Sequence, residues 1–195
     1  PANNVLLYGD AGTGKSSTVK AIANEYAADG LRLVEVKKNQ LYQIPAVMES
    51  LADNPLKFIL FIDDLAFDQD DRTYSVVKTI LEGGLEKRPD NVAIYATSNR
   101  RLLVRQTFSD RAGDEVDAQE TIQEKTALSD RFGLRIPYLG LSKGEFLDLV
   151  EKLARRKGMD VDAADLRREA VKWDMKFPGR TPRGARQFLA SLSAK

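Results

Sequence analysis

Short apolar runs alternate with segments of helical spacing along the first 140 residues of the chain. Several runs end at a glycine, an acidic residue or a small polar residue, and apolar residues then recur every three or four positions. The run at 58–62 is apolar throughout, which is typical of a strand buried on both faces of a parallel sheet. The pattern predicts strands at 5–8, 31–36, 58–62, 92–96 and 134–138, and helices at 13–28, 44–52, 74–81 and 121–128.

This alternation predicts an α/β fold with a five-stranded parallel sheet flanked by helices, in which ligands bind at the carboxyl ends of the strands. A charged stretch at 102–130 interrupts the pattern and predicts an exposed loop before the helix at 121–128. Beyond residue 140 only helical spacing remains, so we expect an α/β core at 1–140 and a small all-helical domain at 141–195. The expected helices of that domain are 143–157, 163–173 and 183–192, with Ser142 and Asp162 as N-caps and Pro182 at a helix start.

The amino-acid composition excludes several kinds of catalytic and metal site. Apolar residues make up 43% of the 195 and charged residues 30%, as in a soluble globular protein. The chain contains no cysteine and no histidine, which excludes disulfides, zinc sites, thiolate nucleophiles and imidazole-based triads. Any bound metal is therefore expected to be a hard cation held by oxygen. Without a membrane-length apolar run or a signal peptide, we expect a cytoplasmic protein that has no membrane partner.

Charge is unevenly distributed along the chain. The whole sequence carries a formal charge of +1, whereas residues 151–195 carry twelve basic and six acidic side chains, a net of +6. A basic segment of this kind favours salt-sensitive contacts with nucleic acid. The first residue is a proline and the first strand is expected at residue 5, so we expect further residues upstream of this sequence.

A glycine-rich segment between the first strand and the first helix indicates phosphate binding. Residues 9–16 read GDAGTGKS, which satisfies the pattern G-x-x-x-x-G-K-[ST] in its required context. The glycines let successive backbone N–H groups surround a β-phosphate, while the lysine reaches the β- and γ-phosphates and the serine hydroxyl reaches Mg²⁺. The predicted nucleotide-binding residues are Gly9, Asp10, Ala11, Gly12, Thr13, Gly14, Lys15, Ser16 and Ser17.

Two further strand ends carry polar groups that fit this chemistry. The apolar run at 58–62 ends in Asp63 and Asp64; Asp63 is expected to hold Mg²⁺ through water, and Asp64 to orient or deprotonate the attacking water. The run at 92–96 leads to Asn99, which is expected to bridge the γ-phosphate and the attacking water, with Thr97 as the second choice. A base-reading N-K-x-D motif is absent, which favours ATP over GTP.

Together these motifs resemble an AAA+ ATPase, and the likeness covers nearly the whole chain. More narrowly, the segments around 63–65, 96–101 and 124–133 are similar to a bacterial AAA+ family named domain of unknown function 815. The resemblance implies a P-loop NTPase core followed by a helical lid. It also implies a trans-acting arginine finger at Arg131 in the segment LSDRFG, with Arg111 as the alternative, and a second sensor at Arg183, with Arg186 as the alternative.

The resemblance implies Mg²⁺-dependent ATP hydrolysis, coupled to the remodelling of an unknown protein or nucleic-acid client at an oligomeric interface. A head-to-tail homo-oligomer is expected, because such contacts close into rings, and the family implies a hexamer. Asp64 stands where Glu is commoner in this superclass, which keeps open a slow-turnover, ATP-gated assembly or loading switch. Nucleic-acid engagement by residues 151–195 and a small-molecule kinase remain further alternatives.

Overall fold

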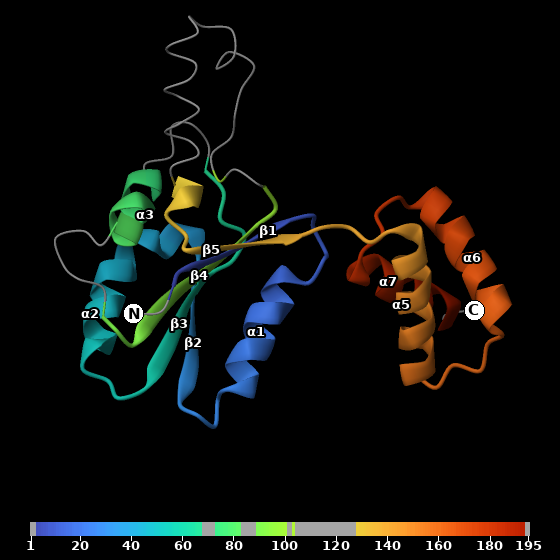
Figure 1. The fold of residues 1–195 in the computed structure, drawn as a ribbon, viewed down its shortest axis with the longest axis horizontal. Coiled ribbons are helices and arrows are strands. Elements are labelled where there is room, and N and C mark those ends of the chain that lie inside the picture. The colour runs from blue at the N-terminus through green and yellow to red at the C-terminus, as the bar shows by residue number, and fades with distance from the viewer. Residues whose placement is uncertain (1–2, 68–72, 83–88, 101–102, 104–127, 194–195) are drawn as a thin grey trace, which may run out of the picture. The chain divides into compact units, whose positions relative to one another are not determined.

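The computed structural model describes residues 3–67, 73–82, 89–100, 103 and 128–193 (Figure 1). By its contacts the chain forms two compact units. We call the first the sheet unit, which comprises Pro1–Gly9 and Lys15–Pro137, and the second the helical unit, which comprises Asp10–Gly14 and Tyr138–Lys195. The short segment Asp10–Gly14 therefore belongs by its contacts to the helical unit, and the domain boundary after residue 140 stays a prediction.

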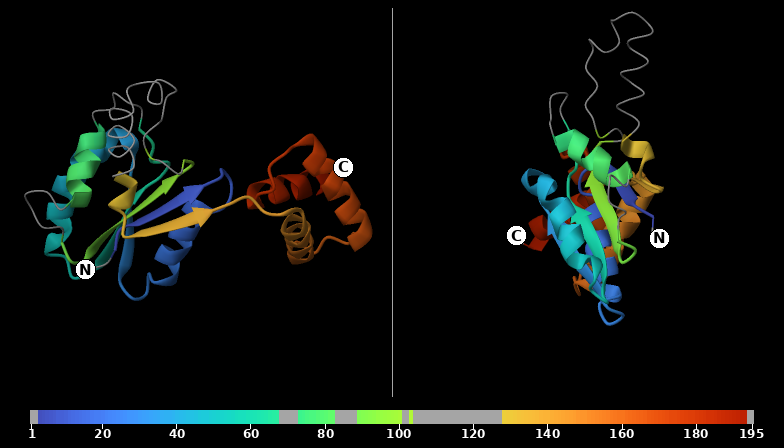
Figure 2. Two further views of the ribbon diagram at one scale, coloured as in Figure 1. Left: turned by 45° about the horizontal axis from the view of Figure 1, so that its top comes forward. Right: turned by 90° about the vertical axis from the view of Figure 1, so that its left-hand side faces the viewer.

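The sheet unit contains a five-stranded parallel sheet, as the sequence predicted. Its strand order is β2-β3-β4-β1-β5, and the register gives parallel pairing of β2 with β3, β3 with β4 and β4 with β1. In Figure 2, β1, β4 and β5 point in the same direction. The strands are β1 (Val5–Gly9), β2 (Leu31–Val36), β3 (Lys57–Ile62), β4 (Val92–Ser98) and β5 (Leu134–Tyr138).

The register brings the carboxyl ends of three neighbouring strands to one edge of the sheet. Ile62 of β3 pairs with Ala96 of β4, and Tyr8 of β1 pairs with Ser98 of β4. The residues that follow these pairs are therefore neighbours at that edge, although they lie far apart in the sequence. This is the edge at which the polar strand ends were expected to meet.

Helices follow the strands of the sheet unit with bounds close to those predicted. The first helix starts at Lys15, two residues later than predicted, because residues 10–14 form a loop instead of a helical turn. A short 3-10 helix, η1 (Lys38–Gln43), was not predicted; its buried Leu41 packs into the core. The helix expected at 121–128 lies almost wholly outside the described residues. The helices are α1 (Lys15–Glu25), α2 (Ile44–Ala52) and α3 (Thr73–Glu82).

The helical unit packs three amphipathic helices around its own apolar core. Ser142 and Asp162 cap two of them as predicted: the Ser142 hydroxyl accepts from the N–H of Glu145, and the Asp162 carboxylate accepts from two N–H groups of the next turn. Hydrogen bonds from the side chain and backbone of Ser142 lower the pKa of Glu145. The helices are α5 (Lys143–Arg156), α6 (Ala163–Lys176) and α7 (Pro182–Ser193).

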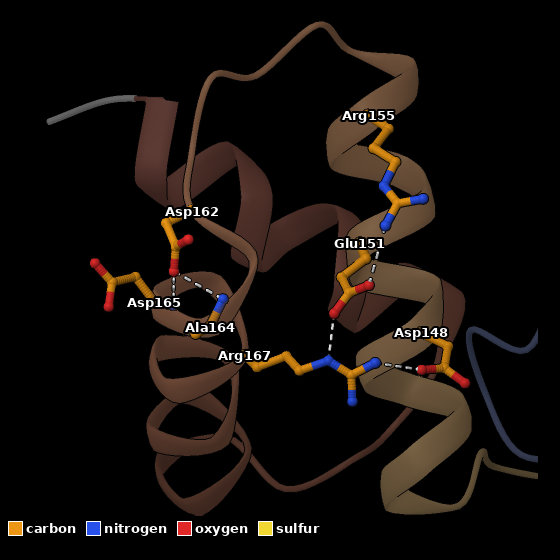
Figure 3. Close-up of polar contacts among 7 residues, drawn as sticks. All are labelled: Asp148, Glu151, Arg155, Asp162, Ala164, Asp165 and Arg167. Carbon is orange, nitrogen blue, oxygen red and sulfur yellow. Dashed lines mark hydrogen bonds and ion pairs between the residues drawn. The ribbon is translucent and has the colours of Figure 1, made fainter.

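Ion pairs neutralise much of the basic charge of the helical unit. Figure 3 shows Arg167 of α6 between Asp148 and Glu151 of α5, while Arg155 approaches the same Glu151 at 3.5 Å. Hydrogen bonds to Glu151 and then to Asp148 raise the pKa of Arg167. Three more basic side chains have a carboxylate partner within the unit, in the pairs Arg168–Asp165, Lys172–Glu169 and Arg180–Asp174. In neither unit is a described helix both long and apolar enough to span a membrane.

Candidate functional site

A buried lysine lies at the start of α1, directly after the glycine loop. Lys15 is only 6% exposed, so its ammonium group needs hydrogen-bond acceptors within the fold. Its Nζ donates to the backbone oxygen of Gly9 at 2.9 Å and to Oδ1 of Asn99 at 2.9 Å. The lysine of the glycine loop and the polar residue after β4, which separate motifs had each assigned a role toward the nucleotide, are therefore in direct contact.

Asn99 also contacts the second acid of the β3 end. Its Nδ2 donates to Oδ1 of Asp64 at 2.8 Å, while its Oδ1 accepts from Lys15. One exposed amide thus connects the lysine to the acid that was expected to activate water. The amide lies where it can exchange these partners for a phosphate oxygen and a water molecule.

The first acid is held by two hydroxyl groups. Oδ1 of Asp63 accepts from Oγ of Ser16 at 2.6 Å and from Oγ1 of Thr97 at 2.5 Å. The hydroxyl of Thr97 in turn accepts from the backbone N–H of Asp64 at 2.9 Å. Because Lys15 and Ser16 are adjacent in the chain, these contacts form a closed ring from the lysine through Asn99, both acids and Thr97 back to Ser16.

Asp64 adopts an unusual backbone conformation. Its φ is +55°, and it is the only described residue other than glycine with a positive φ. This left-handed conformation is disfavoured for most L-residues, although Asp and Asn tolerate it better than others. The N–H groups of Asp64 and of the fully buried Leu65 both donate to Thr97, the first to its hydroxyl and the second to its carbonyl oxygen at 2.7 Å. The end of β4 therefore holds the turn that presents the second acid.

The pair Ser16 and Asp63 fits a magnesium ion. Both supply oxygen, the ligand type that Mg²⁺ prefers, and their oxygens are already 2.6 Å apart. Within the described ranges no three or more acidic side chains gather as a metal cluster. Mg²⁺ would therefore take only one or two ligands from these residues and the rest from phosphate oxygens and water, which is its usual manner of binding beside nucleotides.

The glycine loop has contacts of its own within the helical unit. The N–H of Asp10 donates to the carbonyl oxygen of Tyr138 at 2.9 Å, and the Asp10 carboxylate accepts from the N–H of Gly140 at 2.8 Å. The N–H of Arg183, in the first turn of α7, donates to the carbonyl oxygen of Gly12 at 3.2 Å. Residues 10–14 are therefore held by hydrogen bonds to the end of β5, to Gly140 and to the start of α7.

The positive φ angles of the glycine loop explain its composition. Gly9, Gly12 and Gly14 have φ values of +129°, +79° and +109°, which residues with a side chain rarely adopt. Gly12 is also short of space, because a Cβ there would lie 3.0 Å from Cβ of Arg183. The glycines at these positions are therefore required by the shape of the loop and, at Gly12, by the contact with α7.

The predicted arginines differ in how the structure places them. Arg131 follows a short helical segment before β5, and its guanidinium group forms an ion pair with Glu82 at the end of α3, at 3.0 Å. Arg183 lies beside Gly12 in the helical unit, and Arg186 lies one turn further along α7; both side chains are exposed. Arg111 lies outside the described residues.

Sequence reasoning missed two features of the site. Thr97 was expected only as a second choice for contacting the nucleotide, but its hydroxyl contacts both acids instead. The sequence alone contained no signal for these partners, because they follow from the register: continuing the pair Ile62 with Ala96 by one residue sets Asp63 beside Thr97. The contact between Asp10 and Gly140 had no signal in the sequence, because it depends on how residues 130 positions apart meet.

Comparison with known proteins identifies the family of this chain. The profile of the family described as "Protein of unknown function (DUF815)" matches residues 1–195, the whole chain. The chain belongs to the DUF815 family. It is also 33% identical over 120 residues to the 26S proteasome regulatory subunit 4 homolog of Dictyostelium discoideum, an alignment that covers 53% of this chain and 27% of that protein.

Solved structures share the fold of this DUF815 chain. The Thermotoga maritima RuvB Holliday junction branch migration motor superposes with a TM-score of 0.56 at 18% identity, covering 94% of this chain and 51% of that one. The Aeropyrum pernix ORC2 protein superposes with a TM-score of 0.59 at 15% identity, covering 98% and 56%. The fold is that of AAA+ P-loop ATPases, and the chain spans about half the length of these two proteins.

The crowding at Gly12 leads to a stability prediction. Gly12→Ala should lower the free energy of unfolding by about 1 kcal/mol or more beyond the strain of a left-handed alanine, because the new methyl group meets Arg183. Gly158→Ala is the matched control, since Gly158 also has a positive φ in the helical unit but has open space around its Cβ position. Urea unfolding of both variants measures the difference; equal losses would contradict the contact between Gly12 and Arg183.

Proposed function

We propose that this chain binds ATP with Mg²⁺ and hydrolyses it to ADP and phosphate. The loop Gly9–Ser17 binds the phosphates, Ser16 and Asp63 hold the cation, and Asp64 with Asn99 positions the attacking water. Arg183 contacts the γ-phosphate from α7. The ring of hydrogen bonds from Lys15 through Asn99 and Asp64 carries this proposal, because it unites at one sheet edge the groups that phosphoryl transfer needs.

Lys15 is proposed to bind the β- and γ-phosphates. Its ammonium group, poised by Gly9 and Asn99, exchanges uncharged acceptors for phosphate oxygens when ATP binds. Phosphate oxygens carry negative charge, whereas the oxygens of Gly9 and Asn99 do not, so Coulomb attraction to the ammonium group favours the nucleotide. The successive N–H groups of the glycine loop add further donors to the same phosphates.

Asp64 and Asn99 are proposed to act on the attacking water. The carboxylate of Asp64 accepts a hydrogen bond from Asn99, so an amide and a carboxylate converge on the space beside Lys15. The amide can donate to the γ-phosphate or the water, and the carboxylate can orient the water or take its proton. When bound, Mg²⁺ supplies charge neutralisation for the developing negative charge on the phosphate oxygens.

The second candidate function is a slow switch that responds to ATP binding more than to turnover. The short side chain of Asp64 favours this alternative, because it reaches less far toward a water molecule than the Glu that is commoner at this position. Tight ATP binding with negligible steady-state turnover would support the switch. Turnover of at least about 1 per second, in the ordinary range of enzymes, would support the ATPase.

Assembly of several copies is part of the proposed function. Arg131 is proposed to act on the ATP of a neighbouring copy, in a head-to-tail homo-oligomer for which the family resemblance implies a hexamer. Its ion pair with Glu82 is half exposed, and such pairs contribute only about 0–1 kcal/mol. A neighbour's γ-phosphate can therefore replace Glu82 at small cost.

The client of this ATPase is proposed to be a protein or a nucleic acid. The net charge of the residues after 150 favours nucleic acid, but five of their basic side chains, those of Arg155, Arg167, Arg168, Lys172 and Arg180, already have carboxylate partners. The net charge already counts most of these carboxylates, and the five basic side chains are exposed, so a phosphate can replace their partners at small cost. Both kinds of client therefore stay part of the proposal.

Removal of the ammonium group tests phosphate binding. Lys15→Ala should weaken ATP binding by at least about 10-fold, because one charged hydrogen bond to phosphate contributes about 1.5–3 kcal/mol. Lys20→Ala is the matched control on the same helix, since Lys20 is exposed and pairs loosely with Glu35 at 3.7 Å. Isothermal titration with ATP and Mg²⁺ measures both; equal affinities for the two variants would contradict the proposed role of Lys15.

A neutral replacement of the second acid tests catalysis separately from binding. Asp64→Asn should bind ATP within about 3-fold of the wild type but lose turnover by about 100-fold, in the range that general bases contribute. Asparagine also tolerates the left-handed conformation at this position, so the turn is preserved. Asp53→Asn, at the end of α2, is the control. A normal rate of phosphate release from Asp64→Asn would show that another group activates water.

A variant of the proposed finger tests assembly. Arg131→Ala should lower kcat by about 1,000-fold with ATP binding unchanged, since trans-acting arginines contribute at least this much in related phosphoryl transfers. Arg135→Ala is the control, because Arg135 forms a similar exposed ion pair with Asp130, five residues away in the sequence. Activity per subunit of the wild type should rise steeply with protein concentration. Activity independent of concentration, or a loss of ATP binding in Arg131→Ala, would contradict a trans-acting role.

A further inference from the structure

Thr97 lies between the two acids at the end of β4 and is almost completely buried. It is 1% exposed, and its hydroxyl lies 2.5 Å from Oδ1 of Asp63 and 2.9 Å from the backbone nitrogen of Asp64. The other polar groups of the site belong to motifs with expected roles toward nucleotide or cation. Thr97 contacts the residues that have those roles.

The hydroxyl of Thr97 both donates and accepts a hydrogen bond. It donates its hydrogen to the carboxylate of Asp63 and accepts from the N–H of Asp64. One oxygen makes both bonds, so a movement of one acid away from the other weakens or breaks one of them. Buried hydroxyl groups that are satisfied on both sides make such an arrangement rigid.

The same residue also holds the strained turn after β3. Asp64 has φ at +55°, and its N–H and that of Leu65 both donate to Thr97. Two hydrogen bonds to one residue of the neighbouring strand offset the cost of this conformation. Removal of the hydroxyl alone would leave the N–H of Asp64 without this acceptor while the bond to Leu65 stays.

We propose that Thr97 is a positioning residue that sets the two acids for their separate tasks: it fixes Asp63 toward the cation and holds Asp64 in the left-handed turn that presents its carboxylate to water. It acts through these acids and makes no contact with the nucleotide. This inference rests on the proposed ATPase function.

Three variants of the whole chain test whether the Thr97 hydroxyl has this role. Thr97→Val removes the hydroxyl at nearly constant shape, and Thr97→Ser retains it. Thr79→Val makes the same change at an exposed hydroxyl of α3.

Amide hydrogen exchange of the nucleotide-free chain tests the hydrogen bonds directly. By NMR, the N–H of Asp64 should exchange at least about 10-fold faster in Thr97→Val than in the wild type, while Thr97→Ser and Thr79→Val stay within about 3-fold. The N–H groups at the centre of β3, such as that of Leu60, serve as an internal reference for the folded state. Unchanged exchange of the Asp64 N–H in Thr97→Val would overturn the proposal, whatever the chain does with ATP.

Kinetics test the consequence for the reaction. Thr97→Val should lower kcat by about 100-fold, the scale expected when a reacting group is misplaced by about 1 Å, and raise the Mg²⁺ concentration for half-maximal activity by at least about 10-fold. The KM for ATP at saturating Mg²⁺ should stay within about 3-fold, and Thr97→Ser should recover most of the activity. A raised KM with unchanged kcat and unchanged Mg²⁺ dependence would place Thr97 on the nucleotide and overturn the proposal.

Different results would overturn the proposed ATPase function and the role of Thr97. A wild-type chain that does not bind ATP overturns the proposed function, and the catalytic consequence of Thr97 with it. A wild-type chain that hydrolyses ATP, together with a Thr97→Val variant of normal kcat and Mg²⁺ dependence, overturns the role of Thr97 alone.

Discussion

The candidate site depends on the order in which parallel strands lie side by side. β4 pairs with β3 on one side and with β1 on the other, so the ends of three strands meet at one edge. Each end supplies a different kind of group: the glycine loop after β1, two carboxylates after β3 and a hydroxyl and an amide from β4 and the residue after it. A shift of one residue in the pairing of β3 with β4 would separate Thr97 from Asp63. The same shift in the pairing of β1 with β4 would separate Asn99 from Lys15. Apolar residues that are buried along β3 and β4 make such a shift costly, because it would turn buried side chains to the opposite face.

A buried positive charge imposes the second constraint. Burial of Lys15 is unfavourable unless its ammonium group is hydrogen-bonded, and the fold meets this need with Gly9 and Asn99. Asn99 then satisfies Asp64, and Thr97 joins Asp64 to Asp63. The polar groups of the site therefore stabilise one another before any ligand arrives, and a substitution at one of them is expected to affect its neighbours in a non-additive way.

Sequence patterns predicted the sheet, its helices and most members of the site, because these follow from local rules. Strand β3 could be recognised from its continuous apolar run, and Ser142 and Asp162 from the preferences of helix caps. Features that arise from long-range meetings could not be predicted. The contact of Asp10 with Gly140 joins residues that no local pattern relates, and η1 is too short to give a periodic signal. Thr97 was found at the expected place, but its partners depend on register, which a single sequence does not specify.

Two of the positively charged residues with proposed roles in phosphate chemistry already have side-chain partners inside the chain. Lys15 donates to Gly9 and Asn99, and Arg131 pairs with Glu82. Binding of ATP and of a neighbouring copy are then exchange reactions, in which a phosphate oxygen replaces an internal acceptor. The net gain is smaller than the gross strength of the new bonds, because the old ones are lost. The two exchanges differ in kind, since the buried Lys15 gives up uncharged acceptors, whereas the half-exposed Arg131 gives up a carboxylate that water can solvate. On this argument nucleotide binding is governed mainly by how the ring around Lys15 rearranges, and assembly mainly by how well the neighbouring site desolvates Arg131.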